Sequence, residues 1–136
     1  MKSFDEFIKL GAIKKRGKDD LEPQSIIREA EDRLSYYNKL PLDEKGATYV
    51  TENLYEVIRR LLDAKLLKEG FKSYSHEATV SYLAKLNFPL SDIIFLDELQ
   101  KIRNQIKYAG FKVDLEYSKK VSKFVNRIYK EILNKI

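Results

Sequence analysis

Residues 44–69 carry the longest run of a single apolar pattern in the chain, and this run limits the possible folds more than any other feature. Apolar residues recur at alternating steps of three and four, at Ala47, Val50, Leu54, Val57, Leu61 and Ala64. Such steps place side chains on one face of an α-helix. A helix with so long an apolar stripe needs other helices to cover it, which favours a helix bundle.

The same spacing predicts further helices on both sides of this one. A short amphipathic helix should cover about residues 3–13, and longer helices about 22–40, 75–86, 91–108 and 114–135. Pro23 suits the first turn of the helix that it opens, and Pro41 closes that helix. No segment alternates apolar and polar residues for more than a few positions, so strands are not expected.

Residues typical of helix ends stand at the expected boundaries. Asp43, Ser75 and Ser91 can each cap a helix N-terminus through a side-chain oxygen. Gly70 and Gly110 stand where a helix is to end and a left-handed backbone is wanted. These residues divide the chain into separate helices.

The predicted fold class is all-α, an antiparallel up-and-down bundle of four to five long helices plus a short N-terminal helix. Connections of about four to six residues make successive long helices antiparallel neighbours. We expect one domain over residues 1–136. Residues 1–20 would hold the short helix and a charged loop over 14–20, and residues 22–135 would form the bundle core.

Composition excludes several classes of protein. The chain has no cysteine and a single histidine, so neither a disulfide framework nor a metal site is expected. No cofactor is expected either, because the five scattered glycines form no phosphate-binding loop. The sequence lacks an apolar run of about 18 residues and an N-terminal signal core, which predicts a cytoplasmic protein that does not enter the membrane.

Positive charge gathers in the last two predicted helices. Residues 99–136 contain ten Lys or Arg residues against Asp114, Glu116 and Glu131, a net charge of +7. The whole chain carries +5, which leaves −2 for residues 1–98. Such a one-sided excess suits a polyanionic partner such as RNA, and it equally describes a well-solvated helix surface.

The segment from Leu99 to Gly110, LQKIRNQIKYAG, is the most informative for function. At about 100° per residue, Arg103 falls at the edge of the arc that faces the core. Gln100, Asn104, Lys107 and Tyr108 follow around the helix. Arg and Lys can hold a phosphate, Asn can bind a hydroxyl or base edge, and Tyr can stack. Alternatively, Arg103 pairs with an acidic group of a neighbouring helix and has no chemical role.

Arg103-Asn104-Gln105-Ile106-Lys107-Tyr108, late in a bundle helix and followed by a basic terminal helix, resembles the signature of the HEPN superfamily. That signature is an Arg, usually followed by a polar residue, with a His a few positions later. The resemblance implies a four-helix domain that commonly forms a homodimer with two motifs facing one cleft. Many such domains are metal-independent ribonucleases, often toxins paired with a small nucleotidyltransferase. Others bind nucleotides or act as helical adaptors.

By this resemblance, Arg103, Asn104 and Tyr108 are the candidate catalytic residues, with Arg103 contacting phosphate. Tyr108 stands where active members have His. A phenol titrates at about pH 10 and is a poor base at neutral pH, so ribonuclease activity is expected to be weak or lost. Lys101 and Lys107 are candidate phosphate or RNA contacts on the same helix.

His76 is a further candidate contact to phosphate or RNA. If helices 75–86 and 91–108 form an antiparallel hairpin, position 76 lies at about the axial height of position 101 and close to Arg103. His76 can then face the same groove. Alternatively, it is a partly exposed residue in the first turn of its helix, without a catalytic role.

The leading hypothesis is therefore a dimeric HEPN-like domain that binds RNA or a nucleotide. The main alternative is an adaptor or scaffold bundle, for example the partner of a small nucleotidyltransferase, with an apolar patch or the segment of Phe4, Phe7 and Ile8 as contact. A third possibility is an active ribonuclease that uses His76 or Tyr108.

Overall fold

Six α-helices and two three-residue strands make up the regular structure in the computed structural model, which describes residues 1–17 and 21–136. In chain order they are α1 (Phe4–Lys9), β1 (Ile13–Lys15), α2 (Leu21–Lys39), α3 (Ala47–Lys68), β2 (Phe71–Ser73), α4 (His76–Lys85), α5 (Leu90–Ala109) and α6 (Leu115–Leu133). The helices lie close to their predicted positions, and the predicted fold class is confirmed.

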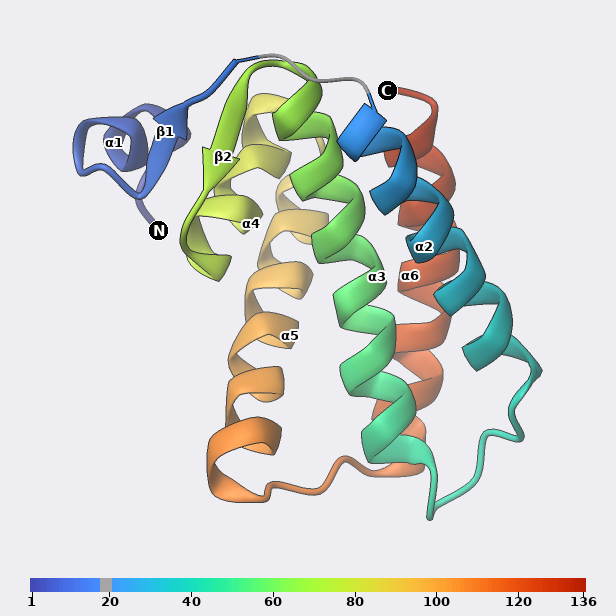
Figure 1. The fold of residues 1–136 in the computed structure, drawn as a ribbon. Helices are drawn as coiled ribbons and strands as arrows, with labels where there is room; N and C mark the ends of the chain where they lie inside the picture. Colours follow the sequence, from blue (N-terminus) through green and yellow to red (C-terminus); the bar gives the residue numbers. More distant parts are fainter. Residues whose placement is uncertain (18–20) are drawn as a thin grey trace.

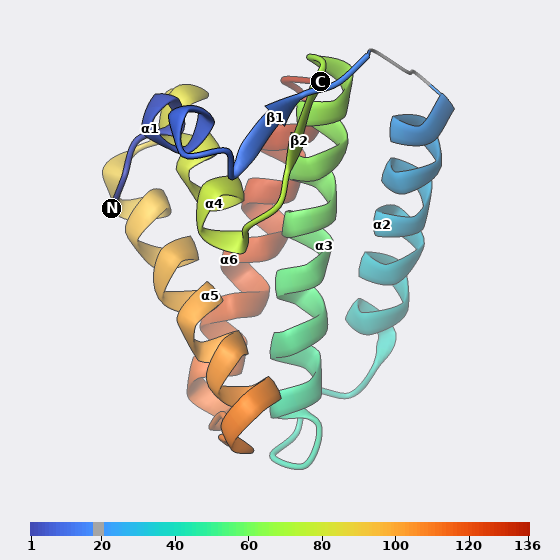
Figure 2. The same cartoon turned by 60° about the vertical axis from the view of Figure 1, so that its left-hand side comes forward.

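Helix α3 lies at the centre of the bundle (Figure 1). It packs against α2, α4, α5 and α6, and the six residues of its predicted apolar stripe are all buried. The connections α2–α3 and α5–α6 lie at the same end of the bundle, away from α1 and the strands (Figures 1 and 2). No helix among residues 1–17 and 21–136 has the length and apolarity needed to cross a membrane.

Several helix ends follow the predicted caps, and two do not. Ser75 accepts a hydrogen bond from the backbone N–H of Ala78 at the start of α4, and Gly110 ends α5 with a φ of 65°. Ser91 was expected to cap α5, which is wrong because the helix already begins at Leu90, after Pro89. Asp43 binds the N–H of Gly46 in the turn before α3, which therefore starts later than residue 44.

The expectation that the chain has no strands is wrong. β1 and β2 pair antiparallel, with Ile13 opposite Ser73 and Lys15 opposite Phe71. A strand of three residues is too short to show the alternation of apolar and polar side chains from which strands are predicted. Residues 14 and 15 of the predicted charged loop thus belong to β1, whereas Lys18, Asp19 and Asp20 lie outside the described residues.

The N-terminal segment packs on the upper part of the bundle. The rings of Phe4 and Tyr82 have centroids 5.3 Å apart, and those of Phe4 and Phe71 are 5.8 Å apart. Phe4 and Phe7 are each only 5% exposed, and Ile8 packs against the same core. Phe4 and Phe7 are therefore covered by their own chain and offer little surface to a protein partner, while Ile8 is only partly buried.

Candidate functional site

Arg103 lies on α5 with its side chain turned toward α3, and it is 9% exposed. Its Nη2 donates to Oε1 of Glu56 at 3.3 Å, and its Nη1 donates to Oδ1 of Asn104, also at 3.3 Å. Within the described residues, Nε of Arg103 has no hydrogen-bond partner. The alternative in which Arg103 pairs with an acidic group of a neighbouring helix is thus confirmed for the pairing itself.

Glu56 joins two arginines of the site. Its Oε2 lies 3.4 Å from Nη1 of Arg59, one turn further along α3, while its Oε1 binds Arg103. Nε of Arg59 also lies 3.8 Å from Oδ2 of Asp63. The other carboxylate oxygen of Asp63, Oδ1, accepts a hydrogen bond from the hydroxyl of Thr79 on α4. Positions 56, 59 and 63 follow at steps of three and four, which puts their side chains on one side of α3.

His76 is the first residue of α4, and its Nδ1 lies 2.9 Å from the hydroxyl of Tyr55 on α3. Burial and the positive charges of Arg59, Arg103 and Lys107 lower the pKa of His76 to about 4. The imidazole is therefore neutral at pH 7. Burial raises the pKa of Tyr55 above its usual range, so the phenol keeps its hydrogen. It donates to Nδ1 when the ring proton of His76 is on Nε2, and accepts from Nδ1 in the other tautomer.

Lys107 and Asn104 accompany Arg103, whereas the other two motif candidates do not. Lys107 is displaced by about 40° from Arg103 around α5, and Lys101 by about 200°. Lys101 is exposed on the outward side and pairs with Asp97 at 3.2 Å. Tyr108, about 140° from Arg103, is 76% exposed. Its ring lies under Lys107, with Nζ 5.4 Å from the centroid.

Arg103 and Lys107 of α5 lie close enough to His76 of α4 for their charges to lower its pKa. No known protein family, curated protein or solved structure matches this chain.

Sequence reasoning missed the contribution of α3 to this site. Glu56, Arg59 and Asp63 interrupt a helix that is otherwise strongly apolar, and they share the spacing that marks one helix face. That spacing was the available signal. The side of the bundle that this face meets depends on how α3, α4 and α5 pack, which only the structure provides.

The site has an excess of positive charge. Arg59, Arg103 and Lys107 are cationic, while Glu56 and Asp63 supply two carboxyl groups. Burial raises the pKa of Asp63 to about 6, so this carboxyl becomes neutral in mildly acid solution. The cluster of these five residues and His76, here called the α3–α5 cluster, can attract an anion.

The stability of the protein should respond to pH through two opposing groups of this cluster. Asp63 has a pKa of about 6 in the folded chain against an ordinary 3.8, so its ionisation lowers the free energy of unfolding as pH rises from about 4 to 6. His76 has a pKa of about 4 against 6.5, so the free energy of unfolding rises with pH between these values. In the wild-type protein the two slopes partly cancel.

Single substitutions should therefore reveal each slope. In Asp63→Asn, urea denaturation at pH 4, 5, 6 and 7 should show stability rising with pH more steeply than in wild type. In His76→Gln, stability should instead fall as pH rises from 4 to 6. Glu116→Gln, at a side chain that is 83% exposed, is the control. Unchanged profiles in both variants would contradict the assigned pKa directions.

Proposed function

We propose that the chain is a HEPN-like helical domain that binds RNA or a nucleotide through Arg103, Asn104 and Lys107, with any ribonuclease activity weak or lost. The observation that carries this proposal is the pair of arginines, Arg59 and Arg103, that Glu56 bridges, with the exposed Lys107 about 40° from Arg103 around α5. The three cations face only two carboxyl groups, those of Glu56 and Asp63, so a bound phosphate can neutralise the remaining positive charge.

The environment of Arg103 supports a role in binding. Its guanidinium is oriented by Glu56 and Asn104 through long hydrogen bonds, while Nε is buried and has no hydrogen-bond partner among the described residues. Lys107 is exposed and can reach a phosphate in solution. An oriented guanidinium beside a mobile ammonium group is suited to phosphate recognition.

The arrangement gives less support to catalysis. Tyr108 stands in place of the family's histidine and points away from Arg103, and His76 is too weak a base to be half-protonated at neutral pH. In the tautomer that carries the ring proton on Nε2, neutral His76 can still donate a hydrogen bond to a phosphate oxygen. We therefore infer binding as the main activity, with Arg103 as its principal contact.

The proposal predicts that Arg103→Ala weakens the binding of a fluorescein-labelled single-stranded RNA about tenfold or more at low salt, and makes the dependence on salt less steep. Fluorescence anisotropy at several salt concentrations measures both. Arg103→Lys keeps the positive charge but loses the paired N–H donors of the guanidinium, so its RNA affinity should lie between those of wild type and Arg103→Ala. Lys123→Ala removes one cation from α6 and is the control. Equal RNA affinity in wild type and Arg103→Ala would refute the proposal.

The family resemblance extends the proposal to assembly. A homodimer that brings two Arg103 residues to one cleft, in a toxin–antitoxin pair with a small nucleotidyltransferase, is the form that the resemblance implies. Sedimentation equilibrium of the purified chain tests the dimer. If the chain is a monomer and still binds RNA, the proposed homodimer is refuted and the proposed RNA-binding site is retained.

An adaptor function is the second candidate, and one surface favours it. Leu90 and Ile94 lie one turn apart at the start of α5 and are 69% and 57% exposed. Two large apolar side chains at this spacing are typical of a helix that contacts another helix. If a stoichiometric protein partner copurifies with the chain without nucleic acid, an adaptor function is favoured over RNA binding. The Ile94→Asp variant should then lose this partner.

A further inference from the structure

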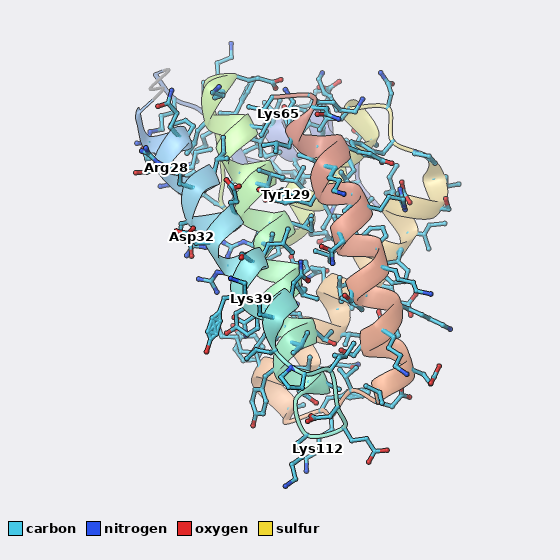
Figure 3. The ribbon with its side chains drawn as sticks, turned by 90° about the vertical axis from the view of Figure 1, so that its right-hand side faces the viewer. Arg28, Asp32, Lys39, Lys65, Lys112 and Tyr129 are labelled. Atoms are coloured by element: carbon cyan, nitrogen blue, oxygen red, sulfur yellow. The ribbon has the colours of Figure 1, made fainter. Side chains whose placement is uncertain are left out.

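A cavity of about 450 Å³ opens at the end of the bundle where α3 begins and α5 ends. Thr48 and Tyr49 of α3 form one side, Ile106 of α5 another, and Phe111 and Lys112 of the α5–α6 connection the third. Figure 3 shows Lys112 at this end of the molecule, next to the α2–α3 loop. The volume lies in the range of small-molecule sites.

Hydrogen bonds hold the walls of this cavity in place. The backbone N–H of Val113 donates to Oγ1 of Thr48 at 2.9 Å, which fastens the α5–α6 connection to the first turn of α3. The N–H of Phe111 donates to the carbonyl of Gln105 at 3.2 Å. Val113 is buried, so the segment is anchored from below as well. The wall formed by the α5–α6 connection is therefore fixed to the bundle, while Glu44 and Lys45 of the α2–α3 loop complete the lining.

Two aromatic side chains that line the cavity are exposed and take no part in the hydrophobic core. Tyr49 is 66% exposed and Phe111 is 40% exposed. Lys45 and Lys112 also line the cavity, against a single lining carboxylate, that of Glu44, so the lining side chains are positive overall. Aromatic faces flanked by lysines are the usual means of binding unpaired bases, because the rings stack and the cations hold the phosphates.

The cavity continues the side of the bundle that carries the α3–α5 cluster. Ile106 lies one turn beyond Arg103 on α5, and Tyr49 lies two turns before Glu56 on α3. At 1.5 Å per residue, the cavity begins roughly 5–10 Å from the Arg103–Glu56 pair. This distance is about the span of one or two nucleotides, so one strand has the length to contact both Arg103 and the cavity.

We propose that this cavity is a nucleobase subsite, which takes one unpaired base of a single-stranded RNA between Tyr49 and Phe111. Lys45 and Lys112 hold the phosphate that flanks this base, while Arg103 and Lys107 hold a neighbouring phosphate. The subsite rests on the proposed RNA-binding function and adds to it the requirement for an unpaired base.

The test compares two labelled ligands of equal length and charge, an oligoadenylate and its abasic ribose-phosphate counterpart. Tyr49→Ala and Phe111→Ala should each weaken oligoadenylate binding by roughly fivefold or more, the usual effect of one stacking contact, with no change in the salt dependence. Neither should alter binding of the abasic ligand. Tyr49→Phe should bind as wild type does, because a phenyl ring stacks equally well.

Tyr36→Ala on α2 is the matched control, since Tyr36 is 57% exposed and α2 lies across α3 from α5 (Figure 1). Circular dichroism verifies that each variant folds, as expected for exposed positions. Loss of affinity in Arg103→Ala but not in Tyr49→Ala and Phe111→Ala would overturn the subsite and leave the proposed function standing. A wild-type protein that binds neither ligand would overturn both.

Discussion

Replacing Glu56 by Gln should strengthen RNA binding by roughly threefold to tenfold at low salt and make its salt dependence steeper. Glu56 bridges Arg59 and Arg103, and its side chain is only 15% exposed. The amide keeps the shape of the side chain but removes the negative charge that competes with a phosphate for both guanidinium groups. Fluorescence anisotropy with labelled single-stranded RNA measures the change.

The same substitution should destabilise the fold. Two buried or half-buried arginines lose a counter-ion, which costs about 1–3 kcal/mol in the free energy of unfolding. Higher affinity combined with lower stability distinguishes a binding site from a structural ion pair. If Glu56→Gln lowers stability and leaves RNA affinity unchanged, the pair serves only the fold. Glu52→Gln, also on α3, controls for the loss of one negative charge.

Replacing Phe4 by Ala should release the N-terminal segment from the bundle. Phe4 is 5% exposed and packs on the rings of Phe71 and Tyr82, and truncation of such a residue costs about 3–5 kcal/mol. The segment can open locally, so the measured global loss is limited to the free energy of its docking. Amide hydrogen exchange should therefore show lost protection at Ile13–Lys15, while α3 stays protected.

Leu10→Ala is the matched control for this prediction. Leu10 belongs to the same segment but is 64% exposed, so its truncation should change stability by less than about 0.5 kcal/mol. Retained protection of β1 in Phe4→Ala would show that the strand pairing holds the segment without the aromatic contacts.

The helical part of the fold was predictable because its signals are local. The buried face of α3 is visible in the sequence as six apolar residues at steps of three and four. Ser75 marks a helix start through its side-chain oxygen, and Gly110 marks a helix end through its left-handed backbone. The pairing of β1 with β2 was not predictable. It joins residues about sixty positions apart, and neither three-residue strand carries a period of its own.

The candidate site was predictable only in part. The position of Arg103 at the edge of the core arc implied an acidic partner, and the α4–α5 hairpin implied that His76 lies close by. The identity of the partner, Glu56, required the packing of α3 against α5. The position of Tyr108 was available from helix geometry, since 140° around α5 already separates it from Arg103.

The place where α4 begins determines how much of the α3–α5 side remains open to solvent. Helix α4 starts at His76, about halfway along the bundle, and runs toward the end that holds α1 (Figure 2). From the Ser75 cap toward the end that holds α1, α4 covers α3 and α5. Toward the opposite end, α4 does not reach the cavity at Tyr49. Lengthening α4 at its N-terminus by two turns would extend this cover by about 11 Å toward that cavity.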